Sequence, residues 1–412
     1  MGKFDTYFLM DAEDVAAYVF EKTFGEGEKK IPWDRETLKA EIPKEHGNLN
    51  YVFRVWDDKG HSLYLKQAGL ETRISKDMKA SLDRNRLESE LLLLQNRLAP
   101  GMVPEIYFYD TVMNACGMED CSDYTVMRNA MLAHQTYPEF ADLISTFMVQ
   151  TLLPTTDIVM DHREKKELQR QFISPDLCDI TEKLVLMEPY GDQNGRNDVY
   201  PPNAAFVKTA LYDDEALKLE VAKLKFHFMT YGEALLHGDL HTGSIFIKPG
   251  AIKVFDCEFG TYAPIGYDVG NVIANLIFAY ANGVATRDAA FVAWTEQMVN
   301  DTIDLFKEKF LRLYEEKVTE PMARVKGFRD AFLKGILRDT SGYAGTELHR
   351  RTVGMAGVLD LKSLTNPKER LLAERICIYA GKTFIMQRDE MACGRAYIDA
   401  LKRATEKAEQ SL

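Results

Sequence analysis

The sequence predicts an α+β protein with two lobes, a small antiparallel sheet near the N-terminus and a larger, mainly helical part after it. Strand-like segments rich in aromatic and β-branched residues lie before residue 130, and helical periodicity prevails beyond it. With 412 residues, 46% of them hydrophobic, the chain can bury more than one core. We expect residues 1–129 to form the first lobe and residues 130–412 the second.

A β-hairpin is expected at the centre of the first lobe. Residues 50–56 and 62–67 read as strands, and the polar residues 57–60 between them end in a glycine that suits a tight turn. Two further strands are predicted at residues 105–109 and 123–127.

A helix is predicted between these two pairs of strands. Four leucines at helical spacing form its apolar stripe: Leu87, Leu91, Leu94 and Leu98. Glu90 lies on the border of this stripe, whereas Glu88 points about a quarter turn further round. A carboxylate on the buried side of a helix usually has a cationic partner, and Lys66 in the second strand is the candidate. We therefore expect Lys66 to pair with Glu90.

Apolar residues at helical spacing predict that the second lobe is built from helices. The expected helical segments are residues 138–152, 216–236, 303–313, 322–338, 355–363 and 368–410, with a buried apolar stretch at 269–280. Residues 175–204 contain several prolines and glycines and are expected to be irregular and to cover a pocket. Residues 341–345, with two glycines, are expected to form a loop.

The composition excludes several classes of partner. The net charge of −12 argues against nucleic acid, because a nucleic-acid surface is typically basic. The six cysteines show no paired spacing, so we expect a reduced cytoplasmic protein rather than a disulfide scaffold. The sequence shows no apolar run of membrane-spanning length and no N-terminal signal, so no membrane partner is expected.

The most informative segment is residues 237–244, His-Gly-Asp-Leu-His-Thr-Gly-Ser, which is followed by Asp256 and Glu258. The apolar segments in between read as a hairpin, which would bring Asp239, Ser244, Asp256 and Glu258 to one end of a sheet. Several hard oxygen ligands suit Mg²⁺, which prefers one or two carboxylates together with water and substrate phosphates. A further acid could orient or deprotonate an attacking hydroxyl, so the pattern indicates phosphoryl transfer.

Taken in order along the chain, these motifs resemble the kinase-like small-molecule phosphotransferases, and within them the 5-methylthioribose kinases. A flexible Asn/Gly loop, a strand lysine and a helix glutamate precede H-G-D-x-x-x-x-S and D-x-E. The matching segments are residues 46–55, 178–182, 189–190, 237–244, 256–259 and 350–354. The resemblance implies a protein-kinase-like fold, transfer of the ATP γ-phosphate to the 1-hydroxyl of 5-methylthioribose in methionine salvage, Mg²⁺, and a cytoplasmic homodimer.

The resemblance also implies roles for individual residues. Asp239 is the expected catalytic acid, while Arg350 and Arg351 are expected to bind sugar hydroxyls or developing phosphate charge. Asp256 and Glu258 would hold Mg²⁺, with Ser244 as an auxiliary ligand. The expected nucleotide-binding residues are Gly47, Asn48, Asn50, Lys66, Glu90 and Met127.

The junction between the lobes departs from the family pattern. Arg128 and Asn129 stand where family members usually carry a Glu-Asp pair, which leaves the nucleotide and sugar preference open. A kinase for another 5-modified ribose, an aminoglycoside or an amino alcohol is one alternative. A catalytically silent kinase-like binding protein is another. For His237 and His241 we favour structural roles.

Overall fold

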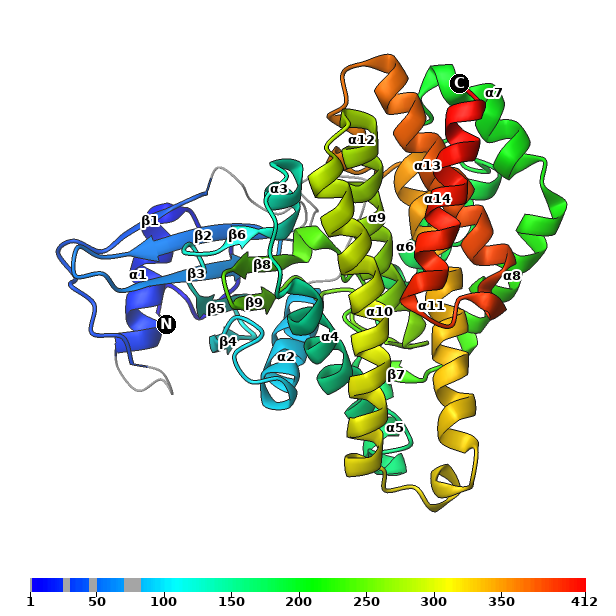
Figure 1. Ribbon diagram of the computed structural model, residues 1–412. Helices are drawn as coiled ribbons and strands as arrows, with labels where there is room; N and C mark the ends of the chain where they lie inside the picture. The colour runs from blue at the N-terminus through cyan, green and yellow to red at the C-terminus, as the bar shows by residue number, and fades with distance from the viewer. Residues whose placement is uncertain (1, 25–29, 44–49, 70–82) are drawn as a thin grey trace. The chain divides into compact units, whose positions relative to one another are not determined.

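The chain forms two compact units in a computed structural model (Figure 1). The first unit comprises Met1–Tyr124 and Lys253–Gly260, and the second comprises Thr125–Ile252 and Thr261–Leu412. The structure describes residues 2–24, 30–43, 50–69 and 83–412. Residues 253–260, which the sequence analysis assigned to the second lobe, group with the first unit, and the division falls five residues earlier in the chain than we expected.

The first unit contains a five-stranded antiparallel sheet with the strand order β1-β2-β3-β5-β4. Its strands are β1 (Lys39–Glu41), β2 (Tyr51–Trp56), β3 (Ser62–Gln67), β4 (Ile106–Asp110) and β5 (Ala115–Glu119). The predicted hairpin is confirmed as β2 and β3, and Gly60 in its turn has the positive φ of 87° that glycine tolerates. Strand β5 was not predicted, although it pairs with β3 and so makes β3 a central strand.

Two helices accompany this sheet, α1 (Ala12–Phe24) and α2 (Asp83–Leu98). The core of the unit is formed by one side of α1 and the inward side chains of the central strands. Its buried members include Val15, Tyr18, Val19, Phe53, Val55, Leu63 and Leu65. The alternation of buried residues along β2 and β3 follows the period of two that a half-buried strand requires.

The second unit is mainly helical. Its helices are α3 (Met127–Leu132), α4 (Phe140–Leu152), α5 (His162–Gln171), α6 (Pro175–Leu184), α7 (Ala204–Val207), α8 (Glu215–Thr230), α9 (Gly266–Thr286), α10 (Ala289–Lys317), α11 (Phe328–Val353), α12 (Leu359–Lys362), α13 (Pro367–Met386) and α14 (Gly394–Gln410). Short strands form two small sheets, β6 (Thr125–Val126) with β8 (Ile245–Lys248) and β9 (Ala251–Val254), and β7 (Ala234–Leu235) with β10 (Tyr262–Ala263). The division between the two units falls within β9, after Ile252. The predicted α+β class, a small antiparallel sheet with a larger helical part, is confirmed.

Helix α9 is the core helix of the second unit. It packs against α10, α11 and α13, and almost all of its residues are buried (Figure 1). By length and composition alone this helix could cross a membrane, which the sequence analysis overlooked, but 89% of its most apolar window is buried within the protein. The helix therefore has the burial of a core element.

The expected loop at residues 341–345 is wrong, because this segment is an internal part of α11. A Cβ atom on Gly342 would lie 2.7 Å from the side chain of Leu224, and one on Gly345 would lie 2.5 Å from the carbonyl oxygen of Gly381. These glycines permit close helix packing rather than a turn. The expected irregularity of residues 175–204 is also wrong in part, since α6 occupies its first third.

Candidate functional site

In the first unit, the buried ammonium group of Lys66 binds two carboxylates. Its Nζ donates to Glu88 Oε1 at 2.6 Å and to Asp256 Oδ1 at 2.7 Å. Burial alone would lower the pKa of Lys66, but the negative charges of Asp256, Glu88 and Glu258 outweigh burial and raise this pKa well above its usual value. Lys66 therefore stays charged and in a fixed direction.

The expected pairing of Lys66 with Glu90 is wrong. Glu90 accepts from Arg86 at 2.6 Å near the surface, whereas Glu88 is buried. The reason is the orientation of α2, whose buried side carries polar residues as well as leucines: Arg84, Asn85, Glu88, Ser89 and Gln95. The leucine stripe alone could not reveal this, because Leu94 and Leu98 are only partly buried.

Asp256 and Glu258 complete this cluster, although not as alternate residues of a strand. Strand β9 ends at Val254, and Asp256 has a φ of 67°, a left-handed conformation that a residue other than glycine adopts at some cost. Glu258 accepts from Asn50 Nδ2 at 3.5 Å and lies 3.8 Å from Arg84 Nε. Burial, together with the charge of Asp256, raises the pKa of Glu258 well above its usual value.

The oxygen atoms of this cluster fit a divalent cation. Burial raises the pKa of Glu88 as it does that of Glu258, so the cluster carries less negative charge than three ionised carboxylates would. Glu88 Oε2 is buried without a hydrogen-bond partner among the described residues. The described residues contain no ready-made group of three His, Cys, Asp or Glu side chains for a metal. Mg²⁺ does not need one, because it commonly uses one or two carboxylates with water and phosphate oxygens.

The second unit holds the loop of residues 237–244, which is anchored to α9. Asp268 Oδ2 accepts from the backbone N–H of His237 at 2.6 Å, and Oδ1 accepts from that of Gly238 at 3.0 Å. Burial raises the pKa of Asp268 to about 7, although the two N–H groups oppose this rise. The sequence analysis missed Asp268. The signal that could have identified it is an acidic residue at the start of the most apolar helix.

Asp239 lies at the centre of a cluster of cationic and imidazole groups. Arg351 Nη2 and Arg350 Nη1 lie 3.2 Å and 3.5 Å from its Oδ1, and His241 Nε2 lies 3.3 Å from its Oδ2. Burial would raise the pKa of Asp239, but contact with His241 and the charges of Arg351 and Arg350 hold it well below its usual range. Asp239 is therefore an ionised carboxylate.

Glu347 orients both arginines from the same helix, α11. Its Oε1 accepts from Arg351 Nε at 2.7 Å and its Oε2 from Arg350 Nη1 at 3.0 Å, as the three- and four-residue spacings on a helix allow. Arg350 Nε is buried without a hydrogen-bond partner in the part of the chain that the structure describes. The sequence analysis missed Glu347 because it placed a loop just before it.

The side chains of Ser244, His237 and His241 contact other residues of the same loop. Ser244 Oγ donates to the carbonyl oxygen of Asp239 at 3.3 Å and lies 3.1 Å from His241 Nδ1. His237 Nδ1 accepts from the backbone N–H of Asp239 at 3.3 Å. Ser244 and Asp239 belong to the second unit, whereas Asp256 belongs to the first.

Of the four other predicted nucleotide-binding residues, the structure describes two. Asn50 is buried, and its Oδ1 accepts from Arg84 Nε at 3.1 Å. Met127 is buried at the start of α3. Gly47 and Asn48 lie outside the described residues.

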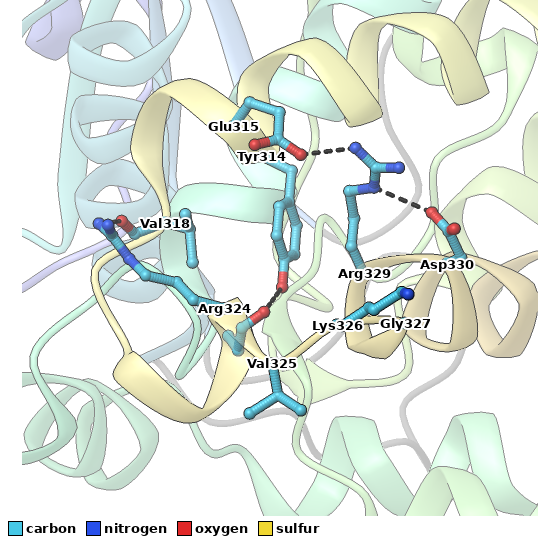
Figure 2. Close-up of a pocket in the computed structure, with 10 residues that line it drawn as sticks. Tyr314, Glu315, Val318, Arg324, Val325, Lys326, Gly327, Arg329 and Asp330 are labelled. Carbon is cyan, nitrogen blue, oxygen red and sulfur yellow. Dashed lines mark hydrogen bonds and ion pairs between the residues drawn. The ribbon is translucent and has the colours of Figure 1, made fainter.

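A cavity of about 390 Å³ lies elsewhere, where α10 ends and α11 begins (Figure 2). Arg329 in its wall pairs with Glu315 and Asp330, and the Tyr314 hydroxyl donates to the carbonyl oxygen of Ala323. None of the predicted site residues lines this cavity. We therefore do not regard it as the candidate site.

Comparisons with known proteins agree with this chemistry. Residues 42–301 match the model of the phosphotransferase enzyme family. The chain is 38% identical to the methylthioribose kinase of Pectobacterium carotovorum subsp. carotovorum, over 87% of this chain and 90% of that protein. It is 35% identical to the methylthioribose kinase of Yersinia pseudotuberculosis, over 94% of this chain and 93% of that protein.

Among solved structures, the choline kinase of Cryptosporidium parvum aligns with a TM-score of 0.48 and 10% identity, and the alignment covers 96% of each chain. The family match, which spans more than half of the chain, confirms the predicted kinase-like fold.

Proposed function

Since this chain belongs to the phosphotransferase enzyme family, and within it to the methylthioribose kinases, we propose that it transfers the γ-phosphate of ATP to the 1-hydroxyl of 5-methylthioribose. In this role the protein serves methionine salvage. The observation that carries the proposal is the ionised carboxylate of Asp239, which two arginines and a histidine hold on a loop anchored by Asp268.

Asp239 orients the acceptor hydroxyl and accepts its proton. In the transfer, the hydroxyl oxygen forms a bond to the γ-phosphorus, the bond from that phosphorus to the bridging oxygen of ADP breaks, and the proton passes to Asp239 and then to solvent. Arg350 and Arg351 supply N–H groups for sugar hydroxyls or for oxygens of the transferred phosphoryl group. Arg350 Nε supports this role, because it is buried without a partner among the described residues, and such an N–H is costly unless a ligand accepts from it.

Lys66 binds the α- and β-phosphates of ATP. An ammonium group has three N–H donors, of which Glu88 and Asp256 take two, so one remains for a phosphate oxygen. Gly47 and Asn48, which lie outside the described residues, remain predicted phosphate-binding residues. Asn50 and Met127 are the other proposed nucleotide-binding residues.

Asp256 and Glu258 hold Mg²⁺, with Ser244 as an auxiliary oxygen ligand. When bound, the ion neutralises phosphate charge during transfer. Asp256 and Glu258 lie two residues apart in the cluster around Lys66, and carboxylate oxygens are ligands that Mg²⁺ prefers, which supports this assignment.

Amino acceptors are disfavoured by the charges around Asp239. Two guanidinium groups lie within 3.5 Å of its carboxylate and would repel a protonated amine. A neutral, hydroxyl-rich acceptor has no such penalty. A catalytically silent role is also disfavoured, because Lys66, Asp239, Asp256 and Glu258 are all present.

We further propose that the protein is a cytoplasmic homodimer. The six cysteines support a reducing compartment, because all of them are free thiols. The dimer rests on family resemblance, and its test is the molar mass in solution.

The decisive experiment is an acceptor screen that measures ADP release with 5-methylthioribose, ribose, 5-deoxyribose, an aminoglycoside and choline. We expect the highest kcat/KM for 5-methylthioribose, with a preference over ribose on the order of 10–200-fold, since one small apolar substituent contributes only that much discrimination. Phosphorus NMR of the product should show a sugar 1-phosphate. A higher kcat/KM for an amine, or a phosphate on another hydroxyl, would refute the proposal.

A further inference from the structure

The second unit contains a buried arginine to which the proposed reaction assigns no role. Arg128 lies at the start of α3, and its side chain is 14% exposed. Its Nε donates to Thr242 Oγ1 at 3.3 Å, and its Nη2 donates to Asn275 Oδ1 at 2.6 Å. Thr242 belongs to the loop that carries Asp239, and Asn275 lies on the core helix α9. The guanidinium group therefore links the loop to the core of the unit.

A network of three side chains surrounds this contact. Asn275 Oδ1 accepts not only from Arg128 but also from the backbone N–H of Thr242 at 3.4 Å and from its hydroxyl at 3.1 Å. Asp360 on α12 lies 3.9 Å from Arg128 Nε and balances its charge. Buried polar groups are costly unless they are paired, so this network holds the loop in one position.

The guanidinium group of Arg128 also lies close to Gly243, the residue that follows Thr242 in the loop. A Cβ atom on Gly243 would lie 3.7 Å from Arg128 Cζ and 2.9 Å from His241 Cε1. His241, which the same Cβ atom would meet, is the imidazole that contacts Asp239 Oδ2. The turn of Thr242 and Gly243 therefore lies close both to Arg128 and to the imidazole that contacts the proposed catalytic carboxylate.

We infer that Arg128 is a positioning residue for phosphoryl transfer, which holds the Thr242–Gly243 turn against Asn275 and thereby fixes His241 and the carboxylate of Asp239. The inference rests on the proposed function, because it requires Asp239 to act on the acceptor hydroxyl. A displacement of about 1 Å in a reacting group lowers a rate about 100-fold, so loss of this support should appear in kcat. The affinity for nucleotide should change little.

If Arg128 had a purely structural role, its replacement would lower stability without a separate effect on kcat. Variants that differ in the charges they keep can distinguish the two roles. Arg128→Met alone leaves the buried Asp360 without its counter-charge, so this variant should melt well below the wild type. The double variant Arg128→Met/Asp360→Asn removes both charges. Arg128→Lys keeps the charge but lacks the planar fork that reaches Thr242 and Asn275 together. Arg388→Met is the matched control, because Arg388 is 13% exposed and pairs with Glu220 at 2.6 Å, away from the loop.

The experiment measures the melting temperature, kcat and the dissociation constant of ATP for each variant. We expect the double variant and Arg128→Lys to melt within about 4 °C of the wild type, since a change near 1 kcal/mol shifts the midpoint of a large domain by about that amount. Their kcat should fall at least 10-fold, with the ATP dissociation constant changed less than threefold. Arg388→Met should retain its kcat.

The inference is overturned if either of these variants melts near the wild-type temperature and keeps kcat within twofold of it. If both variants melt at a much lower temperature, the nearly isosteric variant Thr242→Val is tested by the same criterion, because it keeps the buried charges of Arg128 and Asp360. Failure of the proposed function is seen separately, in wild-type enzyme that does not phosphorylate 5-methylthioribose. In that case kcat is measured for whichever acceptor of the screen, or water, the wild type uses.

Discussion

Replacing Glu88 by glutamine should impair catalysis with a limited loss of stability, and the chain supplies a control two residues away. Glu88→Gln replaces a buried carboxyl group whose Oε1 lies 2.6 Å from Lys66 Nζ. Burial raises the pKa of Glu88, whereas the charge of Lys66 opposes this rise and favours the ionised form. Glu90→Gln removes the charge of a carboxylate on the same helix that pairs with Arg86 at the same distance but is 33% exposed. The two variants therefore make the same chemical change in two environments.

The expected effect on stability is limited because two large contributions oppose each other. At 2.6 Å and an effective dielectric constant of ~20, the attraction between Glu88 and Lys66 is ~6 kcal/mol. Removing both charges from water costs several kcal/mol, and the buried Glu88 Oε2 has no hydrogen-bond partner among the described residues, which adds to this cost. Lys66 also keeps its contact with Asp256. We expect the free energy of unfolding to fall by less than the about 3–5 kcal/mol typical of breaking a buried ion pair, because Lys66 retains Asp256 as its counter-charge.

The effect on catalysis should be larger, because Glu88 directs Lys66. Without the charge of Glu88, the ammonium group is drawn toward Asp256 and away from the nucleotide phosphates. A hydrogen bond to a charged group contributes about 1.5–3 kcal/mol, so kcat/KM for ATP should fall about 10- to 100-fold. Glu90→Gln should remain within twofold of the wild type, since exposed ion pairs contribute little.

The assay is the initial rate of ADP release across ATP concentrations at saturating 5-methylthioribose, with the melting temperature measured for each protein. The reasoning is refuted if Glu88→Gln is folded and keeps its kcat/KM for ATP. An equal loss in Glu90→Gln would also refute it, because the loss would then not depend on contact with Lys66.

Three further predictions concern the remaining carboxylates. Asp239→Asn should lower kcat about 10²- to 10⁴-fold while calorimetry shows unchanged ATP binding, and a kcat near the wild-type value would contradict its role. Asp256→Asn should raise the Mg²⁺ concentration for half-maximal activity, and an unchanged Mg²⁺ titration would exclude Asp256 from the metal site. Burial raises the pKa of Glu233 to about 7 although Ile265 N–H opposes it, so folding favours its protonated form. Glu233 should therefore contribute a loss of up to about 3 kcal/mol of stability as the pH rises from 4.5 to 7. The loss in Glu233→Gln should be smaller than in the wild type by about that amount in denaturant titrations at pH 5 and 8, because Asp268 titrates in both proteins.

The sequence predicted those parts of the first unit that depend on local signals. The β2–β3 hairpin follows from a tight turn between two short strands, and both lie where the sequence places them. The partner of Lys66 was wrong because a leucine stripe indicates the buried side of a helix only approximately. Each residue turns the helix by 100°, so Glu88 and Glu90 differ by more than half a turn. Only the burial of polar residues such as Arg84 and Ser89 on α2 shows which side faces inward.

The missed residues Glu347 and Asp268 share a different cause. Glycines at 342 and 345 usually interrupt helices, and the sequence does not show that Leu224 and Gly381 approach them closely enough to require the missing side chains. Once this segment is read as a helix, a glutamate three and four residues before the two arginines becomes an evident partner. The anchoring of the loop by Asp268 depends on a contact across 31 residues of sequence, for which no local pattern exists.

The charges around Asp239 also explain why such a weak base suits the proposed reaction. Two guanidinium groups and an imidazole stabilise the carboxylate, so it has little tendency to take a proton from a hydroxyl at the start of the reaction. In a loose transition state the acceptor oxygen becomes acidic only as its bond to phosphorus forms, and proton transfer is late. A carboxylate that stays ionised and fixed until then orients the hydroxyl throughout. Glu347 contributes by sharing the arginines, since its negative charge limits how strongly they hold Asp239 and keeps both directed toward it.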